Sequence, residues 1–279
     1  LSRRVNFIEA EVARIDPDQR KVTIAHGEVE GNLPYDYLIF ALGRRLATER
    51  IPGFYEHAHH LLNVDKAMKF GKAISNFHEG RAVIGQCAGA RLPIPVYETA
   101  FALARRLEEN NERERVRITI VSPESIASEF VDPGVALRLQ RALDRHQIEF
   151  LPGVSIEKLT DRAAITSDGA AINSDLLMLL PPFQGAPAAL YHGITNEAYI
   201  NVDWSMQVIG VKGMYAVGDC VNFSGPKMGH MAVRQAEVAA TNLAAEIEGR
   251  EPLTHYDHEM RLVIDAGDSD SLYLHKDMW

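Results

Sequence analysis

One segment near the middle of the chain alternates between strand-like and helix-like patterns, and this strongly limits the fold. Arg81–Ile84 is apolar after its first residue, residues 96–109 follow a helical pattern, and Val116–Val121 is rich in β-branched residues. A strand, a helix and a second strand within about 40 residues form a βαβ unit with parallel strands and a right-handed crossover. A further helix is predicted over 135–146, before several short strands. We therefore predict an α/β domain over residues 80–181.

The first 41 residues predict strands rather than helices. Val5–Ile15 and Lys21–Ala25 carry β-branched residues on either side of the turn Asp16–Asp18. Tyr35–Ala41 forms the next strand-like run. Its last four residues, Leu38–Ala41, are continuously apolar, which predicts a strand buried on both faces.

Two further helices are predicted outside the βαβ unit. We expect Asp65 to cap a helix that ends near Phe77. A longer helix is predicted from Gly229 to Glu248, after the short strand Met214–Val217. The apolar stripe that we expect to face the core from this long helix comprises Val233, Ala236, Ala240, Leu243, Ala244 and Ile247.

The composition excludes several functional classes. With 279 residues, 46% of them apolar and 24% charged, the chain has the profile of an ordinary globular protein with one large or two ordinary domains. The formal charge of −9 argues against a general nucleic-acid surface. Two cysteines do not form a disulfide framework or a zinc cluster, so we expect a reducing, cytoplasmic location. His57, His59 and His60 lack a second ligand set, and no metal site is predicted.

The loop Gly85–Ala90 lies between a predicted strand and a predicted helix, where a dinucleotide-binding loop would lie. Its spacing departs from the G-x-G-x-x-G pattern, because Cys87 occupies the position of the second glycine. The next strand also ends without an acidic residue, at Val121. A plain strand–helix turn without a nucleotide is one interpretation. The other is a Cys87 thiol close to a cofactor, with its pKa lowered by the start of the following helix.

Two glycine-containing strand ends favour a cofactor site elsewhere in the chain. Ala41 and Gly43 follow one apolar strand, and Gly218 and Asp219 follow another. Ligands bind at the carboxyl ends of strands in open α/β sheets, and an aspartate there can accept hydrogen bonds from ribose or ribityl hydroxyls. The amide groups at the start of the helix near Gly229 could stabilise the negative charge of a reduced flavin. Cys220 is expected to be a packing residue.

These motifs resemble those of the two-dinucleotide-binding-domain flavoproteins, the FAD-dependent pyridine nucleotide-disulfide oxidoreductase superfamily. YDYLIFALG (35–43) resembles one flavin motif of these proteins, and GMYAVGDC (213–220) resembles the second. Three details are similar to the sulfide:quinone oxidoreductase branch, namely PVYETA (95–100), LPPFQG (180–185) and GPKMGHM (225–231). The resemblance covers the chain from Val5 to about Tyr273.

The resemblance implies a fold and a domain order. The expected fold class is α/β, a three-layer Rossmann-like FAD domain with an inserted NAD-binding-like α/β domain. The FAD domain is expected to be incomplete, because such proteins open with a βαβ unit carrying G-x-G-x-x-G that this chain lacks. The expected order is the remainder of the FAD domain (1–60), the inserted domain (61–185), the second part of the FAD domain (186–250) and the start of a C-terminal domain (251–279).

The resemblance also implies the cofactor and the site residues. FAD is the expected cofactor, with Ala41, Gly43, Gly218, Asp219, Lys227, Gly229 and His230 as the cofactor-binding residues. Cys87 and Lys227 are the catalytic candidates. The sulfide:quinone oxidoreductases use redox cysteines beside the flavin, and the stretch near Asn63–Asp65 has none. Cys87 is therefore the remaining cysteine candidate for such chemistry.

Three functions follow from this interpretation. The first is a flavin-dependent oxidoreductase that passes electrons from a small donor, such as sulfide, to a quinone or a similar acceptor. The second is an NADH dehydrogenase or NAD(P)H-dependent reductase of the same superfamily, and the third is a non-catalytic flavin-binding or nucleotide-binding module. We expect no nucleic-acid partner, and a homodimer is compatible with the sequence. A peripheral position on the inner face of a membrane would require a C-terminal segment beyond this chain.

Overall fold

The computed structural model describes residues 5–27, 29–130, 132–186, 195–196, 198–266 and 271–277, and the chain divides into two compact units. Unit 1 comprises Leu1–Arg45 and Gln184–His258, and unit 2 comprises Leu46–Phe183 and Glu259–Trp279. The chain passes between the units in β5 (Arg44–Leu46), in β13 (Phe183–Gly185) and between His258 and Glu259. Compared with the boundaries expected from the sequence, residues 46–60 lie with the central α/β domain, and residues 251–258 lie with unit 1.

Unit 2 is built on a four-stranded parallel sheet in the order β12-β6-β7-β8. These strands are Leu176–Leu180 (β12), Gly80–Gln86 (β6), Val116–Val121 (β7) and Glu149–Leu151 (β8). All five residues of β12 and the last five of β6 are buried, as the apolar sequences of parallel strands require. The predicted βαβ unit and the α/β class are therefore confirmed.

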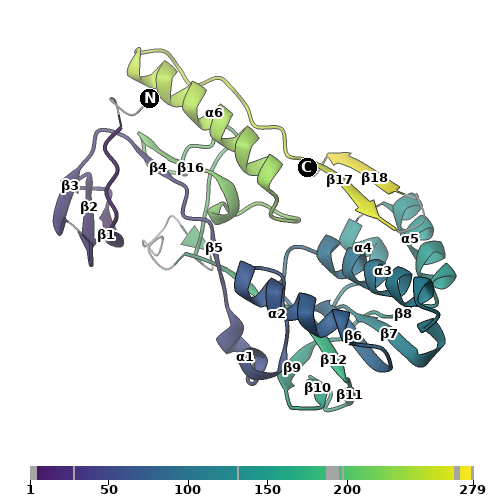
Figure 1. Ribbon diagram of the computed structural model, residues 1–279. Helices are drawn as coiled ribbons and strands as arrows, with labels where there is room; N and C mark the ends of the chain where they lie inside the picture. Colours follow the sequence, from purple (N-terminus) through teal and green to yellow (C-terminus); the bar gives the residue numbers. More distant parts are fainter. Residues whose placement is uncertain are drawn as a thin grey trace. The chain divides into compact units, whose positions relative to one another are not determined.

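The helices of unit 2 pack on this sheet, on a small antiparallel sheet and on one another (Figure 1). They are α1 (Phe54–His57), α2 (Val64–Ser75), α3 (Ile94–Glu109), α4 (Ile126–Phe130) and α5 (Pro133–Arg145). The expected cap of α2 is wrong by two positions. Asn63 occupies the N-cap, and its side chain accepts a hydrogen bond from the Lys66 amide at 2.9 Å. Asp65 lies inside the first turn, where a carboxylate interacts favourably with the helix dipole.

Two small antiparallel sheets complete unit 2. A three-stranded meander contains β9 (Ile156–Leu159), β10 (Ala163–Thr166) and β11 (Ala171–Asn173). The hairpin of β17 (Glu259–Asp265) and β18 (Ser271–Asp277) contacts α3 and α5. Alternate residues of β17 are buried, so the hairpin covers these helices with one apolar face.

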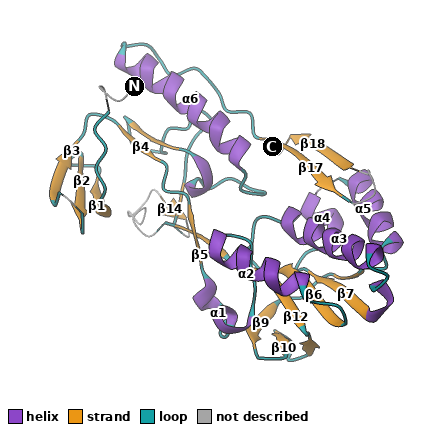
Figure 2. Ribbon diagram, in the orientation of Figure 1, coloured by secondary structure: helices purple, strands orange, loops and turns teal. Residues whose placement is uncertain are grey.

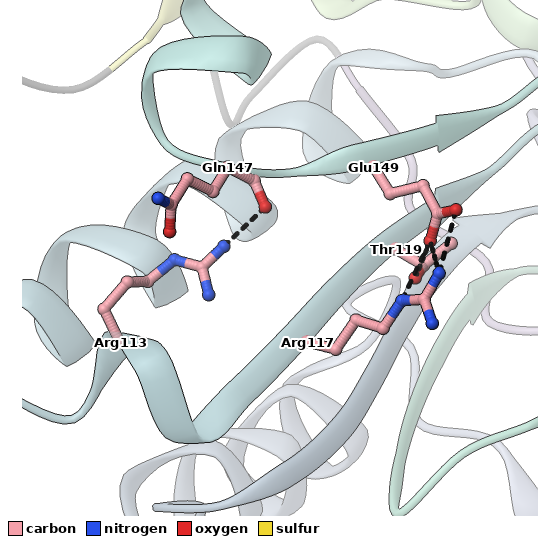
Figure 3. A network of polar contacts seen from close by, with 5 residues as sticks. All are labelled: Arg113, Arg117, Thr119, Gln147 and Glu149. Atoms are coloured by element: carbon pink, nitrogen blue, oxygen red, sulfur yellow. Dashed lines mark hydrogen bonds and ion pairs between the residues drawn. The ribbon is translucent and has the colours of Figure 1, made fainter.

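Polar contacts join β7 and β8 near their amino-terminal ends (Figure 3). Arg117 in β7 donates to the Glu149 carboxylate in β8 at 2.9 Å, and Thr119 donates to the same carboxylate at 3.0 Å. The Arg113 guanidinium donates to the carbonyls of His146 and Gln147 at 2.8 and 2.7 Å. It thereby satisfies carbonyl groups at the end of α5 that have no partner within the helix.

Unit 1 contains a three-stranded antiparallel sheet and a short parallel pair (Figure 2). The first consists of β1 (Glu11–Asp16), β2 (Lys21–Ala25) and β3 (Gly31–Pro34). The parallel pair consists of β4 (Leu38–Phe40) and β16 (Met214–Ala216). Two-residue strands β14 (Thr195–Asn196) and β15 (Tyr199–Ile200) pair with each other. The predicted strand before Glu11 is not formed, since residues 5–10 have no regular structure.

β4 is less buried than its apolar sequence predicts. Phe40 is 2% exposed and packs in the core of unit 1, whereas Ile39 is 41% exposed. Because successive strand residues point to opposite faces, only one face of β4 is covered by the described residues. The expectation of burial on both faces is therefore wrong for this structure.

The long helix α6 (Gly229–Ile247) has the predicted position but buries a different face. Val233 and Ile247, which begin and end the predicted stripe, are 59% and 62% exposed. The buried face comprises Met231, Gln235, Ala239, Asn242 and Ala245. Two of these five residues are polar: Gln235 bonds to the Gly218 amide, and Asn242 bonds to Ser205 and Thr254. Among the described helices, none combines the length and the apolar character needed to cross a bilayer.

Candidate functional site

The carboxyl ends of β4 and β16 lie side by side in unit 1. The strands are parallel with Phe40 opposite Ala216, and the Val217 amide donates to the Phe40 carbonyl at 2.9 Å. The segments that follow, Ala41–Gly43 and Gly218–Asp219, are therefore neighbours, as the sequence predicts. An ion pair links them further, with Arg44 Nε 3.3 Å from Asp219 Oδ2.

A buried glutamine fixes the Gly218 turn. The Gly218 backbone has a φ of +77°, a left-handed conformation that favours glycine. Its amide donates to Oε1 of Gln235 at 2.7 Å, and Gln235 is 4% exposed on the buried face of α6. Sequence reasoning missed Gln235. The available signal was its spacing of four residues from Met231 and Ala239, which places it on their face of the helix.

Lys227 is buried in the loop before α6. It is 8% exposed, its ammonium donates to the Val221 carbonyl, and it lies 5.0 Å from the centre of the Tyr199 ring. Gly229 is the first residue of α6, and His230, the next, is half-buried. The N-cap residue Met228 provides no side-chain cap. The structure thus brings all seven predicted cofactor-binding residues into unit 1.

A second histidine, which sequence reasoning did not single out, holds the same loop. His258 is 2% exposed, and its Nε2 lies 2.9 Å from the Ser224 carbonyl oxygen. Its Nδ1 lies 3.2 Å from the hydroxyl of the buried Tyr256. Burial lowers the pKa of His258 below its ordinary value, which favours the neutral ring. The nearby positive charge of Lys227 acts in the same direction.

The residues around these strand ends fit a flavin nucleotide. A Cβ atom placed on Gly43 or Gly229 would have no heavy atom within 4 Å, apart from atoms of the residues next to it in the chain or helix. A ligand can therefore approach the backbone closely at both positions. Gly43 has a φ of +64°, which also favours glycine. The Asp219 carboxylate can accept hydrogen bonds from hydroxyl groups, and Lys227 supplies positive charge. A cavity of about 10 Å³ beside Gly218, Lys227 and His258 has room for about one water molecule.

Cys87, in unit 2, differs from its expected state. Its side chain is fully buried, and burial raises the pKa of the thiol to about 12. The expected lowering of the Cys87 pKa is therefore wrong, because the loss of hydration outweighs the effect of the helix start at Ile94. The Cys220 thiol in unit 1 is also fully buried, and its sulfur lies 3.2 Å from the Val217 carbonyl oxygen. These contacts fit the packing role predicted for Cys220.

Polar side chains fill the carboxyl ends of β6 and β7 in unit 2. Glu129 from α4 accepts hydrogen bonds from Gln86 Nε2 and the Tyr97 hydroxyl, both at 2.5 Å, and from the Ser122 hydroxyl. Gln86 ends β6, Ser122 follows β7, and Tyr97 belongs to α3. Burial raises the pKa of Glu129. Sequence reasoning missed Glu129, because it lies eight residues beyond the end of β7 and not directly at the strand end.

The sequence matches one protein family over most of its length. A model of the pyridine nucleotide-disulphide oxidoreductases matches residues 1–236. The external alternative NAD(P)H-ubiquinone oxidoreductase B1 of Solanum tuberosum is 23% identical over 81% of this chain and 45% of its own length. The mitochondrial sulfide:quinone oxidoreductase of Mus musculus is 22% identical over 91% of this chain and 59% of its own length. The chain thus spans about half the length of these curated relatives.

Solved structures show the same fold. The sulfide:quinone oxidoreductase of Aquifex aeolicus is 22% identical, with a TM-score of 0.81 over 96% of this chain and 67% of that chain. An FAD-dependent pyridine nucleotide-disulphide oxidoreductase from Desulfovibrio vulgaris gives a TM-score of 0.61 over 91% of this chain and 64% of that chain. The Rossmann-like α/β class is therefore confirmed, and the family match together with these structures indicates FAD as the cofactor. The chain belongs to the pyridine nucleotide-disulphide oxidoreductase family.

Proposed function

We propose that the protein carrying this chain passes electrons from a small reductant other than NAD(P)H, with sulfide as the first candidate, to a quinone. FAD would supply the two-electron chemistry between donor and acceptor. The chain's own contribution would be to bind the cofactor at the ends of β4 and β16 and to hold charge beside it. Asp219 would accept hydrogen bonds from cofactor hydroxyls. Lys227 and the start of α6 would place positive charge near the ring.

The observation that carries this proposal is the set of hydrogen bonds between Glu129 and Gln86, Ser122 and Tyr97 in unit 2, here called the Glu129 network, which argues against NAD(P)H as the donor. In a dinucleotide-binding domain, the cofactor lies across the carboxyl ends of the strands that correspond to β6 and β7. Here the Glu129 carboxylate lies at these ends and is already bonded to Gln86, Ser122 and Tyr97. NAD(P)H could bind there only if this network opened and left buried polar groups without partners, which is costly.

The backbone of the loop after β6 gives independent support. A dinucleotide loop needs a glycine where its backbone approaches the pyrophosphate, and this chain has the buried Cys87 there. The Cys87 amide donates to the Leu180 carbonyl at 2.9 Å, and the Ala90 amide donates to the Cys87 carbonyl at 3.0 Å. These two amides are thus committed to the protein's own carbonyls and are not directed at a phosphate.

The acceptor is proposed from the relatives. The relatives from Solanum tuberosum and Mus musculus are named for ubiquinone and quinone, respectively, and they differ in their named donors. A quinone acceptor is thus the element common to both names. The name of the Solanum tuberosum relative also favours NAD(P)H as donor, and this is the second candidate function for the present chain.

Steady-state turnover with a soluble quinone tests the proposal. Full-length protein with bound FAD is mixed with a short-chain ubiquinone and either sulfide, NADH or NADPH, and quinol formation is measured. We expect quinol formation with sulfide and none with either nicotinamide. Asp219→Ala protein, which should hold little FAD, is the control for quinone reduction by sulfide in solution. Quinol formation with NADH at a rate that saturates at micromolar NADH would favour the second candidate.

A further inference from the structure

The segment that follows α6 runs back across unit 1 and is fixed there by specific hydrogen bonds. Asn242, 1% exposed in α6, donates to the carbonyls of Ser205 and Thr254 at 3.0 and 2.7 Å and accepts from the Thr254 amide at 2.9 Å. Two residues later, the Tyr256 amide donates to the Trp204 carbonyl at 2.8 Å. Residues 254–258, here called the strap, are therefore anchored at their first residues before the chain reaches His258.

At its end, the strap contacts the loop 222–228 that leads into α6. The Phe223 ring stacks on Tyr256 with ring centres 5.5 Å apart and lies 5.1 Å from the His258 ring. Tyr256 and His258 are 1% and 2% exposed. The aromatic contacts and the His258–Ser224 hydrogen bond together hold a loop that has no regular secondary structure of its own between Asn222 and Met228.

The hydrogen-bond partners define one protonation state of His258. A carbonyl oxygen can only accept, so Nε2 must carry a proton and donate to Ser224. In the neutral ring, Nδ1 then has a free lone pair and accepts from the Tyr256 hydroxyl. The Tyr256 hydroxyl therefore donates to the His258 ring, and the His258 ring donates to the Ser224 carbonyl. Ser224 lies three residues before Lys227.

We propose that His258 is a positioning residue for the flavin site, fixing the loop that carries Lys227 and begins α6. The inference rests on the proposed function in one respect, namely that FAD binds beside this loop. Without His258, the Ser224 carbonyl loses its donor and Phe223 loses one ring contact. The loop around Lys227 then loses one of its anchors, and the remaining contacts of Lys227 with the Val221 carbonyl and the Tyr199 ring hold the side chain less firmly. The positive charge beside the cofactor should become mobile, while the strands β4 and β16 remain in place.

Two readouts on the same variants test this. The first is the acetylation rate of Lys227 by acetic anhydride, followed by mass spectrometry, together with hydrogen exchange of a peptide covering 221–232. His258→Ala should increase both by about tenfold, the factor expected from losing one buried hydrogen bond. His258→Gln, whose amide can still donate to the Ser224 carbonyl, should restore much of the protection. His255→Ala is the matched control, because His255 belongs to the same strap but is exposed.

The second readout is the midpoint potential of bound FAD in the full-length protein. His258→Ala should make it more negative, because a mobile Lys227 stabilises the reduced cofactor less, and His258→Gln should return it towards the wild-type value. If His258→Ala does not fold, Tyr256→Phe removes the donor to Nδ1 with little change in volume and should shift both readouts in the same direction. Equal Lys227 acetylation in His258→Ala and His255→Ala would overturn the proposal. Faster acetylation and hydrogen exchange in His258→Ala with an unchanged FAD midpoint potential would also overturn it. The acetylation readout needs no flavin, so its result does not depend on the proposed function.

Discussion

Replacing Glu129 tests whether its carboxylate is held by hydrogen bonds within the protein. The proposal that NAD(P)H does not bind at this site depends on these bonds. In Glu129→Leu, the Tyr97 hydroxyl, on a residue that is 1% exposed, loses its acceptor at 2.5 Å, which costs about 1–3 kcal/mol. Gln86 Nε2 retains the Ser122 hydroxyl at 3.2 Å, so the loss there is smaller. Glu129 is itself partly exposed, and water can replace some of these bonds. We therefore expect unit 2 to lose about 2 kcal/mol of stability.

Glu129→Gln should behave differently, because it keeps the size and the acceptor oxygen. Burial raises the pKa of Glu129, so the folded protein retains a proton in a pH range where the unfolded chain has lost it. Wild-type stability therefore falls as the pH rises from the ordinary glutamate pKa of 4.5 to the raised folded value. Glutamine cannot titrate. The stability of Glu129→Gln relative to wild type should increase across that range and be constant above it.

The assay is native-state hydrogen exchange of the amides of β6 and β7, which report on unit 2 alone. Opening free energies are compared between pH 4.5 and 8 after correction for intrinsic exchange rates. Glu109→Gln, at the exposed end of α3, is the matched control for a glutamate-to-glutamine change outside these contacts. Equal opening free energies for Glu129→Leu and wild type would refute the claim that the carboxylate is committed.

Three further predictions concern other residues. Asp219→Ala should strongly reduce FAD retention in the full-length protein while Asp65→Ala should not, since losing a charged acceptor costs about 1.5–3 kcal/mol; equal flavin absorbance in both variants would contradict this. Cys87→Ser should leave both FAD binding and flavin reduction unchanged, and Cys87 should react with iodoacetamide far more slowly in the native protein than in urea, because the thiol is fully buried and its pKa is raised to about 12. A loss of flavin reduction would restore Cys87 as a catalytic candidate. Asn242→Ala should destabilise unit 1 by about 3 kcal/mol through the loss of three hydrogen bonds. Urea unfolding followed by Trp204 fluorescence measures this loss, and Thr241→Ala, at an exposed neighbouring position, is the control.

The sequence predicted the elements of unit 2 well because their signals are local and unambiguous. β7 has the predicted bounds, Val116–Val121, and α3 begins two residues before the predicted start. The two strands flanking α3 are short runs rich in apolar and β-branched residues, and the helix between them favours a parallel pair. The cap of α2 was misplaced because Asn63 and Asp65 are both good capping residues, and propensity does not separate them.

The errors in unit 1 have a different cause. The helix α6 is rich in alanine, so more than one face satisfies an apolar pattern. The structure selects the face with Gln235 and Asn242, because these side chains bond to the Gly218 amide and to the carbonyls of Ser205 and Thr254. Such partners come from distant parts of the chain and leave no periodic signal. The same reason explains why His258 was not anticipated, since its partner Ser224 is 34 residues away.

The central claim is that this protein's flavin takes electrons from a small reductant and not from NAD(P)H. Rapid anaerobic mixing of the full-length, FAD-loaded protein with sulfide or NADH measures this directly through the loss of flavin absorbance. We predict that sulfide bleaches the flavin and that micromolar NADH leaves it oxidised, because Glu129 and its partners occupy the strand ends where NADH would bind. Rapid, saturable bleaching by NADH would contradict the account.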